Sequence, residues 1–137
     1  GILKEVGFKL LFESIAVQPG KPTTFAVKND KFCFGLPGNP VSSFMQFEML
    51  VKPLIFRMCG GEYQPLVLKV PMGSEYKRKR SKRRSIIPVI IENSEVFPVE
   101  YHGSAHIGSL VNANGIVTIP IGTSPLKKGQ IVDVRQI

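Results

Sequence analysis

The chain has 137 residues, 43% of them hydrophobic, so it is long enough to bury a core as one domain or as two small ones. No apolar stretch approaches the roughly 20 residues that a membrane-spanning helix needs, and no secretory signal is visible, so we expect a cytoplasmic protein without membrane insertion. The two cysteines, Cys33 and Cys59, are typical of reduced core residues rather than of a disulfide framework or a metal site.

The net charge of +8 comes almost entirely from one segment. Residues 77–84 read KRKRSKRR and carry seven positive charges, and taking these seven from +8 leaves the rest of the chain at +1. The positive potential is therefore local rather than spread over a basic surface. A run of this kind is most often a solvated loop, and it also suits phosphate binding, RNA binding or a nuclear-localisation signal.

The chain opens without a methionine, and its first residues resemble the tail of a helix that ends at Gly7, so we expect a fragment of a longer protein. Residues 8–17 (FKLLFESIAV) predict one strand, and the turn-forming residues QPGKP follow at 18–22. A short strand is then expected at 23–27, and a turn at 28–31.

The most informative segment runs from Phe32 to Ser42 and reads FCFGLPGNPVS. It predicts a buried strand that passes through a tight loop into a helix, with Asn39 as the N-cap and Pro40 in the first helical position. The first turn of a helix has unpartnered N–H groups and partial positive charge, so the junction predicts an anion site with the Ser42 hydroxyl near it. A capped junction that binds no ligand has the same local pattern.

The helix that begins at Pro40 has apolar residues at helical spacing, which predicts one face packed on a sheet. Pro53 is expected to kink this helix, and Gly60 and Gly61 are expected to end it. The apolar residues of the predicted face are Val41, Phe44, Met45, Val51, Leu54, Ile55 and Met58.

Beyond Tyr63 the sequence changes to short runs rich in Val and Ile, which are separated by Pro, Gly and Asn. Such runs predict a small all-β unit, either a barrel or a sandwich. Strands are expected at residues 66–70, 85–91, 95–101, 115–120 and 130–135, with a hairpin turn at 92–94 and a brief helix or turn at 106–112.

Several motifs then occur in an order that is typical of one family. PGKP at 19–22 follows a strand, GLPGNPVS at 35–42 opens a helix, and a small β unit comes next. Within that unit lie YHGSAH at 101–106, NANG at 112–115 and KGQIVDV at 128–134. In these motifs the chain resembles the MoeA/gephyrin E-domain family of molybdenum insertases over nearly its whole length.

The resemblance implies both a fold and a function. Residues 1–62 would form the second half of a MogA-like three-layer α/β/α domain, and residues 63–137 the family's small C-terminal β-barrel domain. Such proteins act as elongated homodimers that take adenylylated molybdopterin and molybdate, and with a divalent cation such as Mg²⁺ they release AMP and form molybdenum cofactor. A MogA-type adenylyltransferase is a further candidate partner, whereas nucleic acid and membrane are not expected as partners.

The resemblance also assigns individual residues to the substrate site. Lys21 and Pro22 would border the molybdate pocket and Ser42 would lie at molybdate, while no catalytic residue and no metal ligand is assigned. Simpler roles are a solvated turn lysine for Lys21, a helix-capping hydroxyl for Ser42 and a turn hydroxyl for Ser104. The complete predicted set is Lys21, Pro22, Pro37, Gly38, Asn39, Pro40, Ser42, Arg83, Arg84 and Ser104.

The arginines of the set depend on a register that the sequence leaves ambiguous. The family pattern is arginine, two residues, phenylalanine, one residue and a second arginine. In one register Arg83 comes first, and Ile86 and Pro88 replace the phenylalanine and the second arginine. In the other, Lys79 comes first and Arg84 last. We favour the first register because the predicted hairpin turn then lies at the expected distance.

Other departures from the family concern charge and completeness. Gln18 stands where many relatives have a lysine, which removes one positive charge from the pocket. The family's Gly-Gly-x-Ser loop and its acidic residues for metal and substrate do not occur in these 137 residues, so we expect the chain alone to be inactive. His102 and His106 have the spacing of a zinc pair but no evident third ligand, so loop or domain-interface histidines are favoured.

Two other functions compete with the insertase interpretation. A small basic β-barrel could bind nucleic-acid phosphates through residues 77–84, with steep salt dependence, although Phe97 and Tyr101 are the main aromatic candidates for base stacking. A scaffold that captures a partner peptide in a groove between the domains is the other alternative, and no residue of the chain specifies such a peptide.

Overall fold

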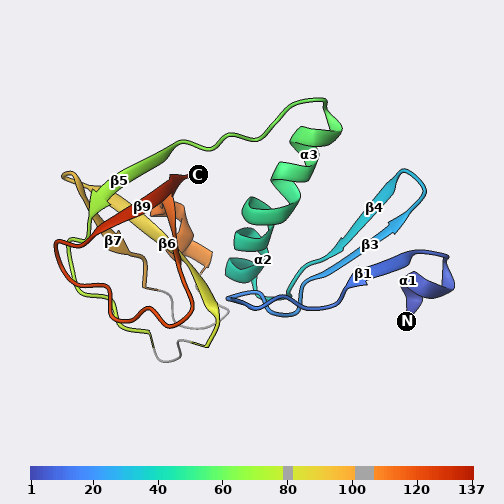
Figure 1. Cartoon of the computed structure of the whole chain (residues 1–137), viewed down its shortest axis with the longest axis horizontal. Helices are drawn as coiled ribbons and strands as arrows, with labels where there is room; N and C mark the ends of the chain where they lie inside the picture. Colours follow the sequence, from blue (N-terminus) through green and yellow to red (C-terminus); the bar gives the residue numbers. More distant parts are fainter. Residues whose placement is uncertain (79–81, 101–106) are drawn as a thin grey trace.

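The computed structural model describes residues 1–78, 82–100 and 107–137. A helical run stands between a three-stranded and a six-stranded sheet (Figure 1). The three-stranded sheet has the order β1 (Lys9–Phe12), β3 (Thr24–Lys28) and β4 (Lys31–Gly35). The six-stranded sheet has the order β2 (Val17–Gln18), β6 (Arg84–Glu92), β8 (Gly115–Ile119), β9 (Ile131–Gln136) and β5 (Val67–Pro71), and β7 (Glu95–Pro98) pairs with β6. The helical elements are α1 (Ile2–Glu5), α2 (Pro40–Gln46), the π-helical η1 (Phe47–Val51), α3 (Lys52–Met58) and the 3₁₀ turn η2 (Ile107–Asn112).

The strand predicted at residues 8–17 is wrong as a single element. Its first part forms β1, which pairs antiparallel with β3, whereas β2 pairs parallel with β6 in the other sheet. The pairing of β1 already shifts register between Leu10 and Phe12. The residues between β1 and β2 therefore carry the chain from one sheet to the other, and a pattern of alternating residues does not reveal such a crossing.

The prediction that Phe32 and Cys33 lie in a buried strand is also wrong in this structure. β4 is an edge strand of its sheet, the Phe32 side chain is 43% exposed, and Cys33 is half-buried. Cys59 is exposed rather than a core residue. The expected turn before β4 is confirmed, because Asn29 adopts a φ of 51° between the paired strands β3 and β4.

The predicted start and end of the helical run are confirmed. Asn39 is the N-cap of α2, its side chain accepts a hydrogen bond from the Ser42 N–H at 3.2 Å, and Pro40 is the first residue of the helix. At the other end Gly60 has a φ of +81°, a conformation that glycine adopts without the strain of a Cβ atom.

Pro53 acts on the hydrogen bonds of the helical run. The N–H of Lys52 donates to the Phe47 carbonyl five residues earlier, which is the π-helical pattern. The next bond at this spacing, to the Glu48 carbonyl, would need the N–H of Pro53, which proline lacks. The π-helical turn before Pro53 therefore leaves the carbonyl of Glu48 free, and the kink expected at Pro53 stays a prediction.

Only the first half of the predicted apolar helix face is packed on a sheet. Met45 is fully buried and packs with Ile86 of β6 and Ile116 of β8. In α3, by contrast, the Ile55 side chain is 44% exposed and that of Met58 is 60% exposed. The helical face thus leaves the six-stranded sheet after the π-helical turn.

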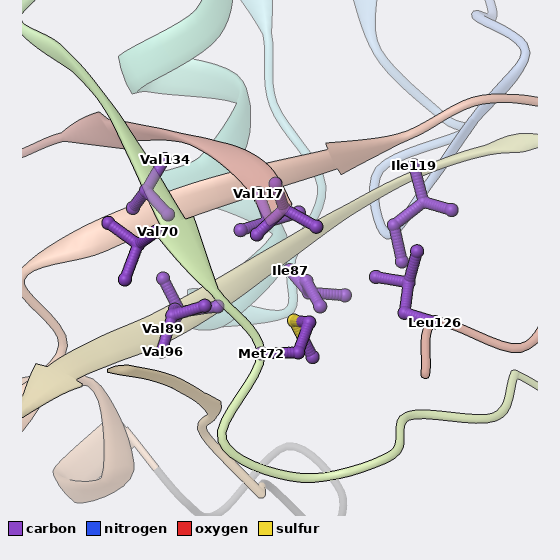
Figure 2. Packing of buried hydrophobic residues seen from close by; sticks show 10 residues of the cluster. Val70, Met72, Ile87, Val89, Val96, Val117, Ile119, Leu126 and Val134 are labelled. Atoms are coloured by element: carbon purple, nitrogen blue, oxygen red, sulfur yellow. The ribbon is translucent and has the colours of Figure 1, made fainter. Parts of the chain in front are cut away.

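The five strands predicted beyond Tyr63 are present as β5 to β9, with ends shifted by a few residues. The sheet also takes β2 from before the helical run, so it is mixed rather than purely antiparallel. Its inner face holds the larger core cluster, which Figure 2 shows as aliphatic side chains from facing strands. The cluster comprises Val70, Met72, Ile87, Val89, Val96, Val117, Ile119, Leu126, Val132 and Val134. No helix within the described ranges is long and apolar enough to cross a membrane.

Candidate functional site

The loop at residues 19–22 packs directly against helix α2. The side-chain Nε2 of Gln46 donates a hydrogen bond to the Pro19 carbonyl at 2.9 Å. Gly20 is buried with a φ of +112°, and a Cβ atom on it would lie 2.2 Å from Gln46 Nε2. Since Gln46 is four residues after Ser42, the PGKP loop lies beside the helix face that carries Ser42.

A second set of hydrogen bonds fixes the other side of this loop. The hydroxyl of Thr23, which is fully buried, donates to the Gly20 carbonyl at 2.7 Å. The Lys21 carbonyl accepts from the N–H groups of Ile15 at 3.0 Å and of Thr23 at 2.9 Å. Gln46 and Thr23 were not predicted as site residues. The sequence did hold one signal for Gln46, since a polar glutamine directly follows Met45, a residue of the predicted apolar helix face.

The backbone around Lys21 is thus held while its side chain extends freely. Lys21 and Pro22 are exposed, and the Lys21 ammonium has no hydrogen-bond or ion-pair partner in the described part of the chain. The loop that leads into α2 is more open, since Pro37 is half-buried and a Cβ atom on Gly38 would meet no atom within 4 Å.

Ser42 is buried in the first turn of α2, with 8% of its surface exposed. The capping bond to its N–H comes from Asn39, so a capping role for the Ser42 hydroxyl is not what the structure shows. That hydroxyl takes part in no hydrogen bond to the residues that the structure describes, and it is therefore free to donate to a ligand.

Strand β2 brings the end of the basic run beside the same loop. Val17 is the partner of Arg84 and Gln18 is the partner of Ser85, and the Arg84 N–H donates to the Ala16 carbonyl at 3.2 Å. Because side chains alternate along a strand, Arg84 projects from the same sheet face as Ile86, the face on which α2 packs.

The arginines of the basic run differ in their hydrogen bonding. Arg78 donates to the Arg83 carbonyl at 2.7 Å, to Ser85 Oγ at 3.0 Å and to the Pro120 carbonyl at 2.6 Å, so its guanidinium fixes the start of β6. The side chains of Arg83 and Arg84 make no such bonds within the described ranges. The sequence of the basic run does not show which arginine has which role, because the partners of Arg78 come close to it only when the sheet has folded.

Some predicted residues lie outside the described residues, namely Lys79 and the whole of the YHGSAH motif at 101–106, which includes His102, Ser104 and His106. Among the residues that are described, no three His, Cys, Asp or Glu side chains come together as a metal site requires. The described site therefore consists of cations, backbone N–H groups and a hydroxyl. Such a donor set is complementary to an oxyanion.

Comparison with known proteins identifies the family. Residues 69–137 match the model of the MoeA C-terminal region (domain IV). A molybdopterin molybdenumtransferase of Staphylococcus aureus (strain Mu50) is 32% identical over 97% of this chain, which spans 33% of that relative's length. The enzyme of the same name from Staphylococcus epidermidis (strain ATCC 12228) is 30% identical, again over 97% of this chain and 33% of its own length.

Solved structures agree with the sequence comparison. Two solved structures of molybdopterin biosynthesis MoeA proteins from Pyrococcus horikoshii match with TM-scores of 0.83 and 0.80 and with identities of 34% and 26%. They cover 96% and 94% of this chain, while the chain covers 33% of each of them. The chain spans about a third of the length of these relatives, and it belongs to the MoeA family.

Proposed function

We propose that the protein containing this chain is a molybdopterin molybdenumtransferase that inserts molybdate into adenylylated molybdopterin and releases AMP. Its curated relatives carry that enzyme name, and the matched region extends over almost all of the chain. The observation that carries the proposal is the convergence of the PGKP loop, helix α2 and the start of β6, through the hydrogen bond from Gln46 to Pro19 and the pairing of β2 with β6.

The charges and donors of this convergence suit a tetrahedral dianion. Lys21 and Arg84 supply two cations without partners in the described part of the chain. The unpartnered Ser42 hydroxyl lies one helical turn before Gln46, the residue of α2 that bonds the loop. Bonds from such cations to an oxyanion are charge-assisted and short. We therefore assign Lys21, Ser42 and Arg84 to molybdate, with Arg83, Pro22 and the loop at 37–40 around them.

The Mg²⁺ that the family resemblance implies does not fit the described residues. They offer no cluster of three carboxylate, imidazole or thiolate side chains for a cation. We therefore assign no residue of this chain to Mg²⁺. The phosphates of the adenylylated substrate, and residues that have no counterpart in these 137, are the places where we propose it binds.

The remaining features of the proposal follow from the length of the relatives. Since the chain spans 33% of the Staphylococcus aureus relative, we propose that residues 1–62 complete a MogA-like α/β domain together with further polypeptide. We propose that residues 63–137 form a separate C-terminal β domain and that the whole enzyme is a cytoplasmic homodimer supplied by a MogA-type adenylyltransferase. The 137-residue chain by itself should then form no molybdenum cofactor under conditions in which the intact protein does.

Calorimetric titration of the intact protein with molybdate tests the site. Loss of one charge-assisted hydrogen bond should raise the Kd about tenfold in Lys21→Ala and in Arg84→Ala, and less in Ser42→Ala. Lys128→Ala and Arg57→Ala remove exposed cations elsewhere on the chain and should leave the Kd unchanged. An unchanged Kd in all three site variants would show that molybdate binds elsewhere.

A further inference from the structure

Gln46 is a buried polar side chain on the helix face that carries Ser42. It is 1% exposed and donates to the Pro19 carbonyl through Nε2 at 2.9 Å. We propose that Gln46 is a positioning residue of the anion site, which sets the place of Lys21 relative to Ser42. This inference rests on the proposed function, because it assumes that Lys21 contacts the anion.

The contact between helix and loop depends on both partners. A Cβ atom on Gly20 would lie 2.2 Å from Gln46 Nε2, so only a glycine at this position allows the loop to lie this close to the Gln46 side chain. The hydrogen bond to Pro19 opposes movement of the loop away from the helix. The Gln46 side chain therefore sets the separation between the PGKP loop and α2 through this bond.

The loop cannot adjust freely behind this contact either. The buried Thr23 hydroxyl holds the Gly20 carbonyl, and two N–H groups hold the Lys21 carbonyl. The backbone of residues 19–21 is thus bonded on both sides, while the ammonium of Lys21 has no partner among the described residues. A site with its backbone already ordered avoids the entropy cost of ordering a loop when the ligand binds.

A positioning role and a merely structural role of Gln46 predict different coupling to Lys21. If Gln46 acts through the placement of Lys21, its replacement weakens molybdate binding only while Lys21 is present. If Gln46 simply supports the fold, its replacement has the same effect whether or not Lys21 is present. A double-mutant cycle on the molybdate Kd separates the two.

The cycle uses Gln46→Met, Lys21→Ala and the double variant in the intact protein, with molybdate as the titrant. Methionine keeps the unbranched shape and removes the amide, and Gln64→Met makes the same change at an exposed site as the control. Loss of one neutral hydrogen bond should raise the Kd about fivefold in Gln46→Met, and less than about twofold when it is added to Lys21→Ala.

Each outcome decides the inference. Equal factors in both backgrounds, or no change in Gln46→Met, overturn the positioning role while the anion site itself stands. No change in Lys21→Ala overturns the assignment of Lys21 to the anion and this inference with it, while the site itself falls only if Ser42→Ala and Arg84→Ala also leave the Kd unchanged. If Gln46→Met does not fold, Thr23→Val releases the same loop from its other side with little change in shape, and it must show the same dependence on Lys21.

Discussion

The guanidinium of Arg135 in β9 donates a hydrogen bond to the main-chain carbonyl of Glu48 in the π-helical turn. Within the helical run this carbonyl lacks a hydrogen bond, because Pro53 has no N–H to donate to it. The same guanidinium nitrogen lies 3.6 Å from Glu48 Oε2 and 3.2 Å from the Tyr63 hydroxyl, and the guanidinium carbon lies 4.9 Å from the centre of the Tyr63 ring. Arg135 thus joins the six-stranded sheet to the helical run.

Replacing Arg135 with methionine should therefore destabilise the chain. Arg135→Met leaves the Glu48 carbonyl unpartnered and removes one of two cations from a carboxylate that is 7% exposed, although Lys52 remains 3.0 Å from it. We expect a loss of about 2–3 kcal/mol in the free energy of unfolding, measured by urea denaturation. Arg57→Met, at the exposed end of α3, is the matched control and should change stability by less than about 0.5 kcal/mol. An equal loss of unfolding free energy in the two variants would contradict the role of Arg135 in joining the sheet to the helical run.

Changes at Asn39 should separate the stability of the helix from its affinity for an anion. Asn39→Ala loses the cap to the Ser42 N–H and should cost about 1 kcal/mol of stability. Asn39→Asp keeps a capping oxygen and should retain that stability, while its negative charge should weaken molybdate binding. Thermal unfolding and molybdate titration of both variants measure the two effects, and parallel changes in both properties would count against an anion site at this junction.

Gly115 should tolerate no side chain. A Cβ atom there would lie 2.5 Å from Val134 Cγ1 and 3.2 Å from Val89 Cγ2, and both valines belong to the larger core cluster. Overpacking of this kind costs about 1–3 kcal/mol, so Gly115→Ala should lower the urea midpoint clearly. Gly61→Ala is the control, because the nearest atom to its Cβ would be a carbonyl oxygen at 3.6 Å. A midpoint for Gly115→Ala equal to that of the control would show that the core accommodates the methyl group.

The free energy of unfolding should fall as the pH rises above about 10. Burial raises the pKa of Tyr76 against the opposing charge of Arg78. Burial works against the charged form of Lys52, but the hydrogen bond and charge of Glu48, with those of Tyr63, outweigh it and raise the pKa of Lys52. For both groups the folded value exceeds the unfolded one, so their contribution is complete below about pH 10 and is lost as the pH rises through the folded values.

Replacing Tyr76 isolates one part of this loss. Tyr76→Phe cannot ionise, so its free energy of unfolding should fall less steeply than that of the wild type above about pH 10. Denaturant titrations at neutral pH and at several alkaline values provide the comparison. Identical slopes for the two proteins would show that Tyr76 does not contribute to the alkaline loss.

The sequence predicted the features that depend on neighbouring residues. The cap at Asn39, the helix end at Gly60 and the strands of the second half follow from local turn chemistry and periodicity, and the structure confirms them. The sequence did not predict the hydrogen bond from Gln46 to Pro19 or the pairing of β2 with β6, because these contacts join residues far apart in the chain. The exposure of Phe32 was missed for a related reason, since an apolar strand has the same pattern at the edge of a sheet as at its centre.

The π-helical turn also gives the helical run one place where its length can change. A π-helical turn contains one residue more than the α-helical turn it replaces, and each residue of an α-helix rotates the chain by about 100°. Deleting one residue between Phe47 and Val51 would therefore restore regular helical bonding and leave α3 facing much as it does now relative to α2. The same deletion within α3 would rotate the residues after it by that angle, and would turn Tyr63 and the start of β5 away from Arg135.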